Sequence, residues 1–135
     1  MNRDSKVEQA VTEILAQPAL NGVYRLTSTF AGSMPVLDGR ALTDRRDLLG
    51  AIGRALDFPD YYGANWDALD ECLRDLSWRD GPISLLIEHA EAIPDAAMAT
   101  LVEIFLQAAQ GWAEQERVFS LFVAGLERRD IPLLA

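Results

Sequence analysis

The stretch FPDYYGANWDALDECLRDL, residues 58–76, changes from a loop pattern to an amphipathic helix pattern. Pro59 disfavours a helical conformation at the residue before it, so a preceding helix is expected to stop at Phe58. Asn65 is a favourable N-cap residue for a new helix. An apolar stripe with helical spacing follows and consists of Leu69, Cys72, Leu73 and Leu76. The stretch predicts a loop and then a helix from Asn65 to about Leu76, with one face buried.

Helix and strand patterns alternate on both sides of this stretch. Apolar or β-branched runs typical of strands occupy residues 23–30, 36–37, 83–87 and 118–123. Helix patterns begin at three further points, with Ser5 and Glu8 as a capping box, Thr43 as a cap, and Pro94 in the first turn. Strands separated by helices imply parallel pairing through right-handed crossovers. The sequence therefore predicts a small α/β layered domain.

The composition excludes several classes of protein. The chain has 135 residues, enough for one domain at about 150 residues per domain. Its formal net charge is −9, which argues against a nucleic-acid binder because phosphates must be neutralised by basic side chains. Its one cysteine, Cys72, cannot form an internal disulfide and is expected to act as a small core residue. Residues 57–80 alone carry a net charge of −5, so the acidity is concentrated.

The charged residues of the predicted helix share the face opposite its apolar stripe. They are Asp67, Asp70, Glu71, Arg74 and Asp75. A solvated helix face is the simplest interpretation. Three aromatic residues at the helix entrance, Tyr61, Tyr62 and Trp66, favour instead a surface that binds a basic protein. Bracing of the loop by these aromatic residues is the alternative, and it is stronger for Tyr62 than for Tyr61.

An enzymatic interpretation has less support. Asp67, Asp70 and Glu71 could share one magnesium ion in a small hydrolase, but no phosphate-binding loop or second acidic cluster accompanies them. His89 follows a strand pattern without a serine or cysteine motif, so it is expected to be a strand-end residue. We expect no catalytic residues, no metal site and no cofactor.

The start of the chain carries no targeting pattern. Residues 1–15 are charged within the first eight positions and lack the apolar core of a secretory signal. No apolar run reaches the roughly 18 residues needed to span a bilayer. We expect a cytoplasmic protein that is monomeric when free and does not bind membranes.

Residues 58–73 resemble the motif of the barstar family of ribonuclease inhibitors. The matching positions are in ungapped register and comprise Tyr61, Tyr62, Gly63, Asn65, Asp67, Ala68, Leu69, Cys72 and Leu73. The order of the flanking elements agrees as well, from about Val36 to Val123. The resemblance implies a three-stranded parallel sheet with flanking helices over residues 36–135. Residues 1–35 are then an N-terminal extension, a helix and an extra edge strand, packed on that core.

The resemblance also implies a function and a set of contact residues. Members of the family cover the basic active-site groove of a small ribonuclease, and an acidic side chain takes the place of the substrate phosphate. The partner implied here is a basic, barnase-like ribonuclease or a related toxin, which makes this chain an immunity or antitoxin protein. A general interaction module for another basic protein remains an alternative. The residues placed on the partner-binding surface are Tyr61, Asn65, Trp66, Asp67, Asp70, Glu71, Arg74 and Gln107.

Several of these positions depart from the family pattern. Glu71 stands where the prototype inhibitor has its central aspartate, so the charge is kept but the carboxylate lies one methylene further out. Asp70 replaces a tryptophan, and Trp66 replaces a leucine. Arg74 adds a positive charge opposite a basic groove, and Gln107 replaces an acidic contact. The resemblance therefore implies the mode of binding more firmly than the identity of the target.

Overall fold

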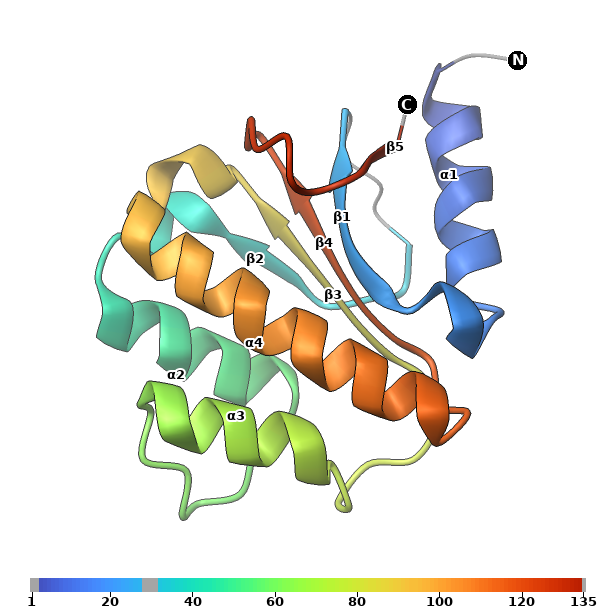
Figure 1. Cartoon of the computed structure of the whole chain (residues 1–135). Helices are drawn as coiled ribbons and strands as arrows, with labels where there is room; N and C mark the ends of the chain where they lie inside the picture. The colour runs from blue at the N-terminus through green and yellow to red at the C-terminus, as the bar shows by residue number, and fades with distance from the viewer. Residues whose placement is uncertain (1–2, 28–31, 135) are drawn as a thin grey trace.

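The computed structural model describes residues 3–27 and 32–134, and these form a five-stranded sheet covered by helices (Figure 1). The strand order is β2-β3-β4-β1-β5, and all neighbouring strands are parallel. The strands are β1 Gly22–Leu26, β2 Val36–Asp38, β3 Ile83–Glu88, β4 Phe119–Ala124 and β5 Leu133–Leu134. The predicted α/β class with a parallel sheet is confirmed.

The helices lie on both faces of this sheet. Those in the described residues are α1 Arg3–Ile14, α2 Arg45–Ala55, α3 Trp66–Asp75 and α4 Asp95–Glu114, with short 3-10 turns at Pro18–Leu20, Gly39–Ala41 and Ala90–Ala92. Figure 1 shows α2, α3 and α4 together on one face and α1 apart from them. The main core lies under α2, α3 and α4, and a smaller core lies under α1.

Strands β3 and β4 supply side chains to both cores. Leu85 and Leu121 lie in the main core, whereas Leu86 and Phe122 lie in the core under α1. Successive side chains of a strand point to opposite faces, so a strand covered on both faces is apolar throughout. All six residues of β4 are buried. This explains the continuous apolar runs that predicted these two strands.

One detail of the predicted sheet was wrong. The first strand, β1, lies between β4 and β5 and is not an edge strand. The edge is formed by Leu133 and Leu134, which pair with Arg25 and Leu26. Two residues are too few to show an alternating pattern, so β5 could not be recognised in the sequence. The last part of the predicted strand over residues 23–30 lies outside the described residues.

Two predicted helix starts were also displaced. Helix α1 begins at Arg3, so Ser5 lies inside the helix and not at the position before its first turn. Helix α2 is capped by Asp44, whose carboxylate accepts a hydrogen bond from the Arg46 N–H at 2.7 Å, and Thr43 lies just before the cap. Serine, threonine and aspartate cap helices similarly well, so the sequence alone leaves such a choice open. None of the helices within the described residues is both long and apolar enough to cross a bilayer.

Candidate protein-binding surface

Helix α3 presents the face that carries most of the predicted contact residues. The Asn65 side chain accepts a hydrogen bond from the Ala68 N–H at 2.8 Å, which confirms the predicted cap. Leu69, Cys72 and Leu73 are buried on the inner side of the helix. The opposite face carries Asp67, Glu71 and Asp75, all exposed. The helix is therefore fixed by its apolar side and leaves three carboxylates in solvent.

The two consecutive tyrosines before α3 have different roles. Tyr62 is half-buried, packs edge-on against Phe58 at 4.7 Å between ring centroids, and donates its hydroxyl hydrogen to the Leu49 carbonyl oxygen at 3.0 Å. Burial raises the pKa of Tyr62, so the hydroxyl stays protonated and keeps this bond. Tyr61, by contrast, is 74% exposed. Tyr62 braces the loop on α2, and Tyr61 is left free to contact another molecule.

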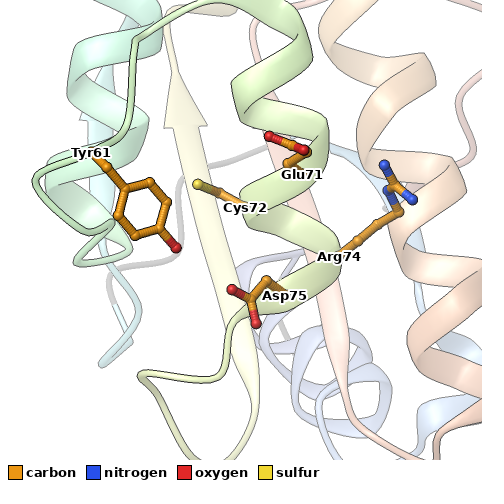
Figure 2. A pocket seen from close by; sticks show the side chains of 5 residues that line it. All are labelled: Tyr61, Glu71, Cys72, Arg74 and Asp75. Carbon is orange, nitrogen blue, oxygen red and sulfur yellow. The ribbon is translucent and has the colours of Figure 1, made fainter.

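Two adjoining hollows lie along α3 and share Tyr61 and Glu71. The first has a volume of about 430 Å³ and is lined by Tyr61, Glu71, Cys72, Arg74 and Asp75. Figure 2 shows the Tyr61 ring and the Cys72 side chain facing each other across it, with Asp75 below Cys72 on the same helix. The second has a volume of about 610 Å³ and is lined by Tyr61, Gly63, Asn65, Trp66, Asp67, Ala68 and Glu71. Below, "the acidic face" means these two sets of residues together.

The charges on and beside the acidic face are not all equivalent. Asp70 and Arg74 form an ion pair, with Asp70 Oδ2 and Arg74 Nη2 3.0 Å apart. Within residues 3–27 and 32–134, no ion pair engages Asp67, Glu71 or Asp75. The positive charge of Arg74 is thus balanced by Asp70. The net charge of α3 is then that of the three unpaired carboxylates, Asp67, Glu71 and Asp75.

These carboxylates act on the groups beside them. Desolvation, with the charges of Asp75 and Glu71, raises the pKa of Tyr61. Burial, again with the charges of Asp75 and Glu71, raises the pKa of the Cys72 thiol. A thiol held in its neutral form is a poor nucleophile, which agrees with Cys72 as a core residue.

The carboxylates are not arranged as a metal site. Among the described residues, no group of three or more His, Cys, Asp or Glu side chains is placed to hold a metal ion. Asp70, one of the three candidate ligands, is bound to Arg74 instead. His89 lies at the end of β3, with its Nδ1 3.6 Å from Glu91 Oε1, and lines neither hollow of the acidic face.

Helix α4 brings residues beside Arg74, and they are not the residue of this helix that the family resemblance implied, Gln107. Gln107 is exposed on α4 but lines neither hollow of the acidic face. A third hollow, of about 390 Å³, connects Arg74 with the end of α4 and is otherwise lined by Ala108, Gly111, Trp112, Glu114 and Gln115. These residues come together only through the packing of α3 on α4, which no local pattern reports. Asp75, by contrast, could be placed on the acidic face from the sequence alone, because its spacing of four residues from Glu71 puts both on one helix face.

Comparison with known proteins identifies the family of this chain. Residues 34–124 match the model of the family described as "Barstar (barnase inhibitor)". A Bacillus subtilis (strain 168) protein named "Putative ribonuclease inhibitor YrdF" is 41% identical over 56 residues, which are 42% of this chain and 59% of that protein. The match thus spans about three fifths of that relative's length. The family match covers all of the acidic face and three of the five strands described, and the chain belongs to the barstar family.

Proposed function

We propose that this protein inhibits a basic ribonuclease, or a related ribonuclease-like toxin, by covering its active-site groove with the acidic face. The protein has no catalytic role in this proposal. The observation that carries it is that the exposed Tyr61 and Glu71 both line the two adjoining hollows. The carboxylates of Asp67, Glu71 and Asp75 have no ion-pair partner among the described residues. Such a surface is complementary to a cationic groove that normally binds RNA.

The charge arrangement supports fast and selective association. Clustered carboxylates opposite a basic groove steer the encounter and raise the association rate, an effect that weakens as salt rises. Glu71 then occupies the place of a substrate phosphate, and Tyr61 supplies an aromatic contact at the edge of the same contact area. Close charge pairs in the barnase–barstar complex show this kind of electrostatic coupling.

The magnesium-dependent hydrolase has no observation in its favour. Asp70 is engaged by Arg74, and the remaining carboxylates among the described residues do not form a ligand group. A general module that binds some other basic protein uses the same surface and differs only in its target. An inhibitor stops RNA cleavage by its partner, whereas a general interaction module does not, and this difference separates the two functions.

The test is an RNA-cleavage assay with barnase at increasing amounts of the protein. Cleavage should stop at a ratio of one to one, and the association rate should fall steeply with salt. Glu71→Gln should weaken inhibition at least about tenfold, since it removes the charge and keeps the shape. Glu8→Gln on α1 is the matched control: it removes the same charge on the opposite side of the sheet and should change inhibition by less than about twofold.

The outcome against the proposal is equally concrete. Unchanged cleavage by barnase, and by any ribonuclease that co-purifies with this protein, would leave the inhibitor proposal wrong. A bound basic partner without ribonuclease activity would then support the general module.

A further inference from the structure

The C-terminal end of α3 is tied to the rest of the molecule by two side chains far away in the sequence. The Trp112 indole Nε1–H donates to the Leu73 carbonyl oxygen at 2.7 Å. The Arg117 guanidinium donates to the carbonyl oxygens of Leu76, Arg79 and Gly81 at 3.2, 2.7 and 2.8 Å. We call Trp112 and Arg117 the α3 clamp.

The two members of the clamp also support each other. The Arg117 guanidinium carbon lies 4.9 Å from the centroid of the Trp112 ring, a cation–π contact. Arg117 is only partly accessible to solvent, and burial lowers its pKa, while the guanidinium stays charged. Its N–H groups are thus withdrawn from water and directed at the backbone. A planar guanidinium can satisfy three carbonyls in this fixed geometry, which the single ammonium of a lysine cannot reproduce.

This end of the helix needs such support. Leu76 leaves the helix in the left-handed conformation at φ 45°, and its N–H donates to the Cys72 carbonyl. Because α3 ends at Asp75, the Leu73 carbonyl has no donor from a following helical turn. The N–H of Trp112 fills that place. The positive charge of Arg117 also lies next to the negative end of the helix dipole, which is a favourable interaction.

The last turn of α3 carries part of the acidic face. Asp75 is its final residue, and Glu71 lies one turn before it. An unclamped last turn would fray and let the carboxylates move relative to Tyr61, which is held by the loop that Tyr62 anchors. Binding would then have to order this turn, which weakens affinity.

We propose that Arg117, supported by Trp112, is a positioning residue that pre-organises the acidic face by fixing the last turn of α3. Arg117 is not itself a contact residue in this proposal. The effect on inhibition rests on the proposed function above, but the effect on α3 can be measured in the free protein.

Arg25 provides a matched control. Its guanidinium likewise donates to backbone carbonyls, those of Ile131 at 2.9 Å and Leu126 at 3.4 Å, and so fastens the segment that leads into β5. Arg25 lies on β1 and touches none of the residues of the acidic face in these bonds. Arg25→Met and Arg117→Met therefore remove the same kind of interaction from two different places.

The first measurement is amide hydrogen exchange along the free protein. Arg117→Met should accelerate exchange in the last turn of α3 at least about tenfold relative to α2 and β4, and Arg25→Met should not. Arg117→Lys should recover only part of the protection. Trp112→Phe keeps the ring under the guanidinium and removes the bond to Leu73, so it should accelerate the same turn even if Arg117→Met folds poorly. Equal acceleration along the whole chain would overturn the proposal.

The second measurement is the dissociation constant for barnase, at a temperature where all variants are folded. Arg117→Met should raise it about tenfold, mainly through a faster dissociation rate, and Arg25→Met should leave it within about twofold. Equal effects of the two variants would also overturn the proposal. If the unmodified protein does not bind barnase, the proposed function fails for this target. The exchange experiment alone then tests whether Arg117 fixes the last turn of α3.

Discussion

The hydroxyl of Tyr62 donates to the carbonyl oxygen of Leu49, 3.0 Å away, and this bond ties the loop before α3 to the helix α2. Its neighbour Tyr61 makes no such bond in the described residues and remains 74% exposed. One residue of the Tyr-Tyr pair therefore holds the loop while the other is presented by it. This division of roles leads to measurements that separate folding from binding.

Tyr61→Ala should leave the free energy of unfolding within about 0.5 kcal/mol, because an exposed side chain contributes little to stability. The same change should weaken inhibition of a basic ribonuclease markedly. Tyr62→Ala should lower stability by about 2–3 kcal/mol, because it removes a half-buried ring that packs on Phe58 and the hydrogen bond to Leu49. Urea denaturation followed by fluorescence, together with the inhibition assay, measures both. Comparable losses of stability in the two variants would contradict the assigned roles.

Gly53→Ala should destabilise the protein by about 1–3 kcal/mol, the cost of overpacking. A Cβ at this position would lie 2.7 Å from a ring carbon of Tyr62, whose ring also packs against Phe58. Gly111→Ala in α4 is the control, since a Cβ there meets no atom within 4 Å. That second change should stabilise the helix by about 0.5–1 kcal/mol. Thermal unfolding of the two variants should therefore shift in opposite directions.

Asn65→Ala should cost about 1 kcal/mol through the loss of the α3 cap, and Asn65→Asp should retain most of the stability. The bond at stake is the one from the Ala68 N–H to the Asn65 side chain, 2.8 Å long. Denaturant midpoints give the stability of each variant. An aspartate variant as unstable as the alanine variant would show that the amide makes some other contact.

Asp38 should titrate far below the usual carboxyl range. Hydrogen bonds from the Arg40 side chain and from its backbone N–H lower the pKa of Asp38 to about 2. A lowered folded-state pKa contributes stability above the ordinary value of 3.8, and this contribution is lost as the pH falls from 3.8 to about 2. The carboxyl resonance of Asp38 followed by NMR should confirm this. Arg40→Met should move the titration upward, and Asp130, which is paired with Arg128, should not respond.

Breaking the Asp70–Arg74 pair should change the stability of the protein only slightly but change its rate of association with a partner. Arg74 is exposed, Asp70 is partly exposed, and the two are spaced by four residues on one helix, so a double-mutant cycle should assign the pair only about 0.3–0.5 kcal/mol of stability. Arg74→Ala nevertheless makes the acidic face more negative by one charge. It should speed association with a basic ribonuclease, and the gain should disappear at high salt. Unchanged association rates at low salt would place Arg74 outside the region that faces the partner.

Much of this surface could be predicted because the decisive features are local. A cap at Asn65 and an apolar stripe at helical spacing both lie within residues 58–76, and α3 lies where they place it. The preceding helix α2 ends at Ala55, three residues before the stop that Pro59 predicts at Phe58. The pairing of Asp70 with Arg74 also follows a local rule, that of oppositely charged residues four apart on a helix. Local spacing is information that a single sequence carries in full.

The remaining features depend on contacts between distant segments. Trp112 and Arg117 meet the end of α3 across 39 and 41 residues of sequence, and no spacing rule connects residues so far apart. The two-residue strand β5 exists because β1 offers it an open edge, not because its own sequence demands a strand. The exposed or braced state of each tyrosine was likewise decided by the position of α2, which the loop sequence does not contain.

The place of β1 in the sheet has a consequence for how the chain folds during synthesis. Strands β2, β3 and β4 are neighbours in both sequence order and sheet order, so each can add to the one before it as it leaves the ribosome. Strand β1 is made first, yet Gly22 pairs with Ser120, 98 residues later, and Arg25 pairs with Leu133. Such long-range pairing slows folding because closing a long loop loses entropy before the contacts form. Strand β1, which precedes the other four described strands in the chain, is therefore expected to be among the last of them to reach its place, after the segment that carries the acidic face.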